Sequence, residues 1–434
     1  MSDSILRDDA RFVWHPYTQH HRAPQPVPIA RARGSWLYDT DGRGILDAIA
    51  SWWVTTHGHA HPAITEAIAE QARTLDQVIF AGFTHEPAAR LAAELVSRLP
   101  TSLSRVFYSD DGSTAVEVAI KLSLQSFANR GEPRRLVAAL ENAYHGDTFG
   151  AMAAGARGVF THMYEPLLFE VARLPDPSEG DTLVALDRLL NTRGHELAAV
   201  IVEPLVLGAS GMRVWSAEVL RGMRERTAAA GVHLIADEVM TGFGRTGPMF
   251  ACELAGVQPD LICLSKGITG GVLPLGATVA TEAIFDAFRS DDRRKTFFHG
   301  HSYTANPIAC AAALASLQLF DASCDAARER IATFHATQLA ALHGTRGVKQ
   351  VRHIGTVAAI ELDAPAGYLS DIGRELAAYA LHEGVLLRPL GNVAYCLPPY
   401  CTTNEELGLV YDVVHRFLDG ARVAPITSGG PVDD

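Results

Sequence analysis

Cysteine is scarce in this chain, and the way it is distributed argues against two kinds of stabilising site. The 434 residues include six cysteines, spread from Cys252 to Cys401, and no two of them form a Cys-x-x-Cys pair. A disulfide framework or a zinc site would need paired or closely spaced thiols. We therefore expect reduced, mostly buried cysteines and no bound metal.

Long apolar runs and an excess of positive charge are also missing. No apolar stretch reaches membrane-spanning length, and the N-terminal residues lack the basic and apolar regions of a signal peptide. Lysine and arginine total 37 against 49 aspartate and glutamate, a net charge of −12. This balance disfavours non-specific binding to nucleic acid or to an anionic membrane. We expect a cytoplasmic protein with neither as a partner.

What the chain does contain predicts a large α/β fold. Hydrophobic residues make up 48% and charged residues 20%, which is typical of a soluble protein with a substantial core. Between about 103 and 300, strand-like segments alternate with helical ones, so we expect a mostly parallel sheet covered by helices. The expected strands are residues 105–108, 136–140, 198–202, 233–236, 261–264 and 276–280.

A chain of this length is too long for one compact core, so more than one domain is expected. We predict a large domain over 59–305 and a smaller α+β domain formed by 1–58 and 306–425, followed by a disordered tail over 426–434. Within these parts, residues 10–35 are expected to be irregular and Asp176–Asp181 to form a surface loop.

Two polar residues stand at the ends of neighbouring expected strands. Asp237 follows the apolar run 233–236, and Lys266 follows the run 261–265. Ligands of α/β proteins bind at such strand ends, and burying a carboxylate and an amine is otherwise costly. A structural ion pair at the edge of the core explains these two residues equally well.

A turn that could bind phosphate lies between an expected strand and a helix. There, Gly112 and Ser113 would present backbone N–H groups and a hydroxyl at the start of the helix. The alternative is an ordinary helix N-terminus, where Asp110 and Asp111 complement the helix dipole. Taken alone, the turn favours this alternative.

Three further features are modest by themselves. The Tyr144 ring follows an expected strand and could stack on a planar ligand, or it is a partly buried loop tyrosine. The segment 299–306 precedes a helix and forms another turn that could bind an anion or simply cap the helix. Arg388 could bind a carboxylate through its forked guanidinium, although a surface arginine is the commoner case.

Together these groups suit one planar, phosphorylated cofactor that carries a carbonyl. Pyridoxal 5′-phosphate needs a lysine for its Schiff base and commonly an aspartate on its pyridine nitrogen. Lys266 and Asp237 supply these two groups, and the turn and the ring supply phosphate donors and a stacking surface.

The segment Asp237–Gly247, followed by Ser265-Lys266-Gly267, resembles the signature of the class III aminotransferases. Other stretches resemble the branch of this family that aminates 8-amino-7-oxononanoate in biotin synthesis; they are residues 14–18, 51–53, 57–59, 78–87, 144–152 and 299–304. The resemblance extends from about 11 to 420. It implies a pyridoxal-phosphate-dependent transferase of fold type I, with an α/β large domain and a seven-stranded sheet, and a homodimer with shared active sites.

The resemblance also implies roles for individual residues. Lys266 would carry the cofactor, Asp237 would hold its ring nitrogen protonated, and Tyr17 would assist catalysis. The cofactor would contact Gly112, Ser113, Tyr144, Asp237 and Lys266, with His301 and Ser302 reaching its phosphate from the partner subunit. The substrate would contact Tyr17, Trp52, Tyr144, Lys266, Gly300 and Arg388. Asp147, Arg245 and Tyr395 are secondary candidates.

The implied substrates are S-adenosylmethionine as amino donor and 8-amino-7-oxononanoate as acceptor. Relatives that use ω-amines carry a glutamate shielding their arginine, and the corresponding segment Gly208–Gly211 lacks it. Another class III aminotransferase with an ω-amino acid or lysine as donor remains an alternative, as do a mutase or racemase and a non-catalytic binding protein.

Two expectations concern the walls of the pocket. Trp52 and Trp53 should alternate between faces of their segment, so at most one should face the site. The glycine-rich turn Thr241–Gly247, with Arg245, is a candidate wall of the substrate pocket.

Overall fold

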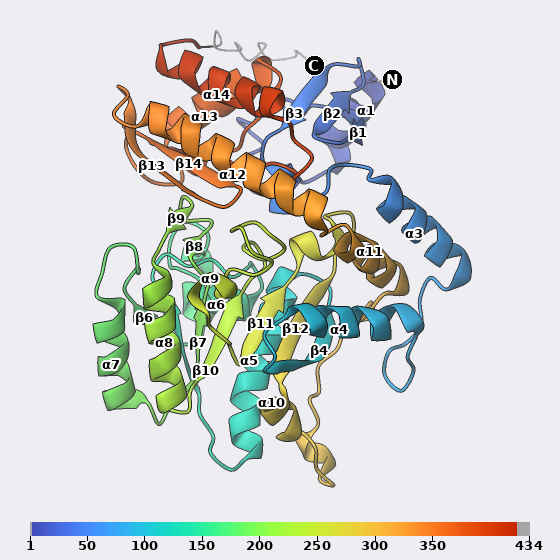
Figure 1. The fold of residues 1–434 in the computed structure, drawn as a ribbon, viewed down its shortest axis with the longest axis vertical. Coiled ribbons are helices and arrows are strands. Elements are labelled where there is room, and N and C mark those ends of the chain that lie inside the picture. The colour runs from blue at the N-terminus through green and yellow to red at the C-terminus, as the bar shows by residue number, and fades with distance from the viewer. Residues whose placement is uncertain (1, 423–434) are drawn as a thin grey trace.

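The fold comes from a computed structural model that describes residues 2–422. Figure 1 shows a large sheet with its helices in the lower part, and the N-terminal strands beside the C-terminal helices above it. The first and last parts of the described chain therefore lie together, on the same side of the large sheet.

The large sheet has seven strands in the order β4-β12-β11-β10-β7-β5-β6. Strand β12 is antiparallel to both of its neighbours, and the other pairs are parallel. This confirms the α/β fold with a mostly parallel sheet. The strands are β4 (Leu103–Ser109), β5 (Leu136–Leu140), β6 (Val171–Leu174), β7 (Leu197–Val202), β10 (His233–Asp237), β11 (Leu261–Leu264) and β12 (Gly276–Thr281).

The central strands are apolar throughout because both of their faces are covered. Along β10 and β11, Ala236 and Ile262 pack into one hydrophobic core, and Ile235 and Leu261 pack into the core on the opposite face. A strand buried on both sides carries a continuous apolar run instead of alternating residues. This is why these strands were recognisable from the sequence.

Helices cover both faces of the sheet. One core contains α5 (Gly112–Asn129), α6 (Phe149–Ala154) and α10 (Glu282–Asp286). The other contains α4 (Glu86–Arg98), α7 (Thr182–Arg193), α8 (Ala217–Ala229), α9 (Cys252–Ala255) and α11 (Pro307–Gln318), and α3 (Pro62–Thr74) packs on α11.

The upper part contains two small sheets. In one, β1 (Ile29–Arg33), β2 (Trp36–Asp39) and β3 (Gly44–Asp47) are extended by β15 (Val385–Leu386), which pairs in parallel with β3. The other consists of β13 (Val348–Ile354), β14 (Val357–Leu362) and β16 (Val393–Cys396). Their helices are α12 (Ala322–Leu342), α13 (Asp371–His382) and α14 (Asn404–Leu418). The predicted domain boundaries stay a prediction, and the tail 426–434 lies outside the described residues.

The expectation that residues 10–35 are irregular is wrong at both ends. Helix α1 spans Ser2–Phe12, and β1 pairs with β2, with Arg31 opposite Tyr38. The Arg31 guanidinium carbon lies 3.7 Å from the centre of the Tyr38 ring. A polar strand of this kind is held by its neighbour, so its own sequence carries no apolar pattern.

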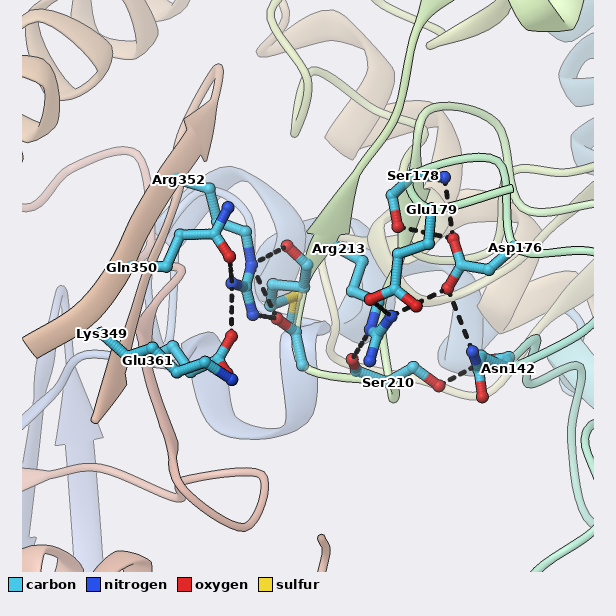
Figure 2. A network of polar contacts seen from close by, with 12 residues as sticks. Asn142, Asp176, Ser178, Glu179, Ser210, Arg213, Lys349, Gln350, Arg352 and Glu361 are labelled. Carbon is cyan, nitrogen blue, oxygen red and sulfur yellow. Dashed lines mark hydrogen bonds and ion pairs between the residues drawn. The ribbon is translucent and has the colours of Figure 1, made fainter. Parts of the chain in front are cut away.

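The predicted surface loop at Asp176–Asp181 is also partly wrong, because Asp176 is buried. Its carboxylate accepts hydrogen bonds from Asn142 Nδ2 at 3.1 Å and from the Ser178 N–H at 2.9 Å, and it pairs with Arg213 at 3.2 Å (Figure 2). A buried carboxylate needs such partners. Asn142 and Arg213 come from segments distant in sequence.

Among the described helices, none is by itself both long and apolar enough to cross a membrane. Only α11 and α12 taken together meet the length and composition required, and they are bent by 74°. Most residues of α11 are buried inside the fold, which accounts for its apolar composition.

Candidate active site

A cavity of about 570 Å³ lies where the parallel strands end. Asp237 is the last residue of β10, Lys266 follows β11, and Glu203 follows β7, while Tyr144 stands in the turn after β5 and Gly112 begins α5, the helix after β4. The carboxyl ends of parallel strands meet along one edge of a sheet. The topology therefore brings residues from five separate segments into one cavity.

Lys266 lines this cavity and is half-buried. Its Nζ atom lies 4.8 Å from the centre of the Trp53 ring. Burial lowers the pKa of the Lys266 amine to about 8, and the charges of Asp237 and Glu203 partly oppose the shift. Roughly a tenth of the amine is therefore neutral, and hence nucleophilic, at pH 7.

Asp237 is held by a buried histidine. The Nδ1 atom of His145 lies 2.6 Å from Asp237 Oδ2, and Asp237 Oδ1 accepts the Val239 N–H at 3.1 Å. Both side chains are almost inaccessible to solvent. The two contacts fix the direction in which the Asp237 carboxylate points.

Glu203 joins two walls of the cavity. Its Oε1 atom accepts the Tyr144 N–H at 2.9 Å, and its Oε2 atom accepts the Gly208 N–H at 3.0 Å. Burial raises the pKa of the Glu203 carboxyl to about 7. This residue therefore anchors the backbone beside Tyr144 to the segment that begins at Gly208.

The N-terminus of α5 forms another wall. Asp111 caps this helix by accepting the Thr114 N–H at 2.8 Å, as the ordinary-cap interpretation predicts. Gly112 and Ser113 nevertheless line the cavity, and Ser113 Oγ accepts the Asp147 N–H at 3.0 Å. A Cβ atom on Gly112 would lie 2.6 Å from Val239 Cγ1, so only glycine fits here without a shift of its neighbour.

Tyr17, Tyr144 and Asp147 line the cavity and contact one another through their polar groups. The Tyr17 hydroxyl donates to Asp147 and lies 3.4 Å from the Tyr144 hydroxyl. Burial and then Asp147 raise the pKa of Tyr17 to about 12, and burial also raises the pKa of Tyr144. Both phenols are therefore neutral at physiological pH and can donate hydrogen bonds.

Both Trp52 and Trp53 line the cavity, so the expectation that at most one faces the site is wrong. The backbone of this segment is not regular, since Ser51 has φ 62° and ψ −94°. An irregular backbone removes the alternation expected of a strand. Trp53 Nε1 donates to the hydroxyl of Tyr395 at 2.9 Å, which places Tyr395 in the wall as well.

Arg388 lies against this aromatic wall. Its guanidinium carbon is 4.3 Å from the centre of the Trp52 ring and 6.0 Å from that of Tyr17. Within the described part of the chain, no hydrogen bond or ion pair holds the guanidinium. Its donors therefore face the cavity without a protein acceptor.

Arg245 is not part of the cavity wall, so the proposed role of the Thr241–Gly247 turn is wrong. The guanidinium is fully buried elsewhere and donates to the carbonyls of Thr55 at 3.0 Å and Pro398 at 2.7 Å. Val239 and Met240, just before the turn, line the cavity instead. Arg245 therefore connects the turn after β10 with the segments that contain Thr55 and Pro398.

The segment Gly300–Ser302 does not line the cavity of its own chain, as far as the described residues go. His301 lies 3.0 Å from His299, with its other ring nitrogen 3.6 Å from Asp110. The Ser302 carbonyl accepts a hydrogen bond from Gln77 at 2.8 Å. Their expected contact with a partner subunit's cofactor stays a prediction.

The family described as aminotransferase class-III matches residues 17–418. The chain belongs to the class III aminotransferases. It is therefore an aminotransferase that depends on pyridoxal 5′-phosphate, with the fold of that family.

Individual relatives agree with this assignment. The aminotransferase is 51% identical over 419 residues to the adenosylmethionine-8-amino-7-oxononanoate aminotransferase of Synechococcus elongatus, covering 94% of this chain and 98% of that one. The crystal structure of the enzyme of that name from Methanocaldococcus jannaschii superposes with a TM-score of 0.93 at 34% identity. The match covers 97% of this chain and 100% of that one. An amine transaminase from an uncultivated Pseudomonas species, in its PLP-bound form, gives a TM-score of 0.86 at 32% identity, covering 93% and 97%.

The residues of the cavity fit this cofactor. A half-buried amine and a buried, oriented carboxylate stand at the ends of neighbouring strands, as the two ends of a pyridoxal ring require. The start of an 18-residue helix offers N–H groups for a phosphate, and the Asp111 carboxylate is bonded to its own helix. A Cβ atom on Gly146 would meet Ser113 Oγ at 1.8 Å, so glycine is also required beside this turn.

Sequence reasoning missed several residues that the fold brings to the cavity. His145 and Glu203 contact Asp237 and Tyr144 respectively, and Phe160 and Tyr368 line the outer wall. His145 and Glu203 each stand just after a buried strand, close to a residue that was recognised, and this position was their only signal. Phe160 and Tyr368 lie in irregular segments and carried none.

Proposed function

We propose that this aminotransferase moves the amino group of S-adenosylmethionine to 8-amino-7-oxononanoate and forms 7,8-diaminononanoate. The observation that carries the proposal is Arg388, whose guanidinium lies against the aromatic wall of the cavity and has no acceptor among the described residues. Such an arginine suits the carboxylate that both substrates carry. The names of the relatives supply the identity of the two substrates.

Bound pyridoxal phosphate supplies an electron sink that stabilises the carbanion left when a proton leaves the substrate. Asp237, oriented by His145, would hold the pyridine nitrogen protonated. Lys266 would hold the cofactor between reactions and, as a neutral amine, would take the proton from the substrate carbon and deliver it where the reaction needs it. The second half-reaction runs these proton movements in the reverse order.

The remaining cavity residues bind and orient. Gly112 and Ser113, which line the cavity, would hold the phosphate, and Tyr144 would pack against the ring. The Tyr17 hydroxyl, a neutral donor bonded to Asp147, recognises both substrates. The faces of Tyr17, Trp52 and Trp53 attract the sulfonium cation of the donor and also pack against the apolar chain of the keto acid.

We further infer a cytoplasmic homodimer in which Gly300, His301 and Ser302 complete the partner's active site. Support comes from the large apolar side chains exposed around this segment, such as Phe298 at 76% and Tyr303 at 64%. A cytoplasmic location is supported by the six cysteines, all of which are free thiols.

Mixing two inactive variants tests the shared site. A Lys266→Ala chain still supplies Ser302 to its partner, and a Ser302→Ala chain still supplies Lys266. A mixed dimer therefore has one intact site, and unfolding and refolding the two variants together should restore activity. If the mixture stays as inactive as each variant alone, the sites are not shared.

The amino donor is tested by following the visible absorption of the bound cofactor in single turnovers. Adding S-adenosylmethionine should convert the holoenzyme to its aminated form, and 8-amino-7-oxononanoate should reverse this. Lysine is run in parallel as the competing donor. Conversion by lysine, or by a simple ω-amine, and not by S-adenosylmethionine would replace our proposal with the alternative donor.

A further inference from the structure

A second cavity adjoins the one that contains Lys266. It has a volume of about 410 Å³, and its wall includes Tyr144, Gly146, Asp147 and Ala209, which also line the first cavity. Arg388 and Lys266 line only the first. The two cavities therefore meet beside the reacting centre and extend away from it toward different groups.

The arginines of the second cavity are already occupied. Arg213 pairs with Asp176 and Glu179, as Figure 2 shows, and Arg352 pairs with Glu361 at 2.9 Å and donates to the Gly211 carbonyl at 2.6 Å. Arg157 donates to backbone carbonyls, including that of Ala153 at 3.1 Å. Each of these cations has acceptors within the protein, in contrast to Arg388. The second cavity is thus poorly suited to a carboxylate or a phosphate.

Small and aromatic residues form much of the rest of its wall. Small residues from three loops form part of it; they are Gly155, Ala156, Gly158, Gly211, Ala366 and Gly367. The rings of Phe160 and Tyr368, centred 4.7 Å apart edge to face, stand between the two cavities. Aromatic rings beside small residues, with the neighbouring cations already paired, suit an uncharged planar group.

We propose that the second cavity binds the adenosine portion of S-adenosylmethionine. This inference rests on the proposed function. The donor carries a nucleoside that the keto acid lacks, and it needs additional space that the acceptor does not. Both substrates react at Lys266, but the acceptor extends along the aromatic wall to Arg388 while the nucleoside of the donor extends past Phe160 and Tyr368. One active site thereby accepts two unlike substrates in turn.

The proposal predicts that filling the second cavity harms only the donor half-reaction. Ala366 is exposed and lines the second cavity but not the first, so Ala366→Trp fills it without entering the core. Val159, which is 57% exposed, provides the same test from another loop as Val159→Trp. Leu369→Trp is the matched control, since Leu369 is in the same loop as Ala366, is 73% exposed and lines neither cavity.

Each half-reaction is measured separately with the holoenzyme. We expect Ala366→Trp to lower the second-order rate constant for S-adenosylmethionine at least tenfold, roughly the loss expected when one good contact surface is blocked. The rate constant of the aminated enzyme with 8-amino-7-oxononanoate should stay within about twofold of that of the unsubstituted enzyme. Leu369→Trp should change neither. Equal losses in both half-reactions, or no loss in the first, would overturn the proposal.

A binding experiment gives a second measurement that does not depend on turnover. 5′-Methylthioadenosine carries the nucleoside without the amino acid. It should inhibit the donor half-reaction competitively, and Ala366→Trp should abolish this inhibition. If it binds equally well to both enzymes, the nucleoside does not occupy the second cavity. If the unsubstituted enzyme does not react with S-adenosylmethionine at all, the proposed function fails, and that outcome is distinct from failure of the subsite.

Discussion

His145 and Asp237 form a buried pair, with 2.6 Å between Nδ1 of the imidazole and Oδ2 of the carboxylate. They come from the turn after β5 and the end of β10, strands that are separated in the sheet by β7. The pair gives the carboxylate a fixed direction toward the cavity. In the proposed function, this direction is what places the carboxylate at the pyridine nitrogen.

Removing His145 should therefore weaken catalysis more than it weakens folding. A hydrogen bond to a charged group contributes about 1.5–3 kcal/mol, so His145→Ala should lower kcat roughly 10- to 100-fold. His145→Gln, which keeps a donor, should recover part of the loss. The visible spectrum of the bound cofactor should titrate differently in His145→Ala, which a purely structural role would not cause. Unchanged spectra and equal losses in both variants would contradict the positioning role.

The lowered pKa of Lys266 predicts how cofactor uptake depends on pH. With the pKa at about 8, the neutral fraction of the amine rises through this pH. The rate at which the apoenzyme binds pyridoxal phosphate should increase roughly tenfold between pH 7 and 9, as followed by stopped-flow absorbance. The folded pKa lies below the unfolded value of 10.5, so the contribution of Lys266 to stability rises with pH between about 8 and 10.5.

Lys266→Arg is the control for this experiment, because it keeps a positive charge but offers no amine that titrates in the range. It should show no covalent uptake at any pH tested. A rate for the unsubstituted apoenzyme that stays flat up to pH 9 would mean that Lys266 keeps an ordinary pKa.

Arg388 is expected to determine affinity for the carboxylate of the acceptor. Arg388→Ala should raise KM for 8-amino-7-oxononanoate roughly 10- to 100-fold, since a charge-assisted contact of about 1.5–3 kcal/mol is lost. Arg388→Lys keeps the positive charge but lacks the forked guanidinium, so its KM should lie between those of the unsubstituted enzyme and of Arg388→Ala. Steady-state kinetics with the acceptor varied checks this. An unchanged KM in Arg388→Ala would remove the residue from substrate binding.

We expect that position 112 must be glycine, because Val239 leaves no room for a side chain beside the cofactor site. A Cβ atom there would lie 2.6 Å from Val239 Cγ1, so Gly112→Ala forces one of them to move. Overpacking of this kind costs about 1–3 kcal/mol, and the dissociation constant for pyridoxal phosphate should rise roughly tenfold. Adding Val239→Ala to the same chain should restore much of the affinity. Equilibrium titration of each apoenzyme with pyridoxal phosphate measures the dissociation constants. If Val239→Ala does not restore the affinity, the clash lies elsewhere.

The sequence by itself determined the central strands and the residues at their ends. A strand buried on both faces needs a continuous apolar run, and the polar residue that ends such a run stands at the edge of the sheet wherever the strand lies. Asp237 and Lys266 could be recognised for this reason, and the capped turn at Gly112 followed from its local chemistry. These are properties of short segments, and they hold before the chain folds.

The tertiary structure alone decided which of two similar arginines faces the cavity. Arg245 and Arg388 look alike in the sequence, but Arg245 lies in the interior and donates to the carbonyls of Thr55 and Pro398, whereas Arg388 rests on Trp52 and has no acceptor among the described residues. The same holds for Trp53 and for the second cavity, whose walls come from loops far apart in the chain. Whether a polar group is satisfied depends on partners that only the folded chain brings near it, and no local pattern encodes them.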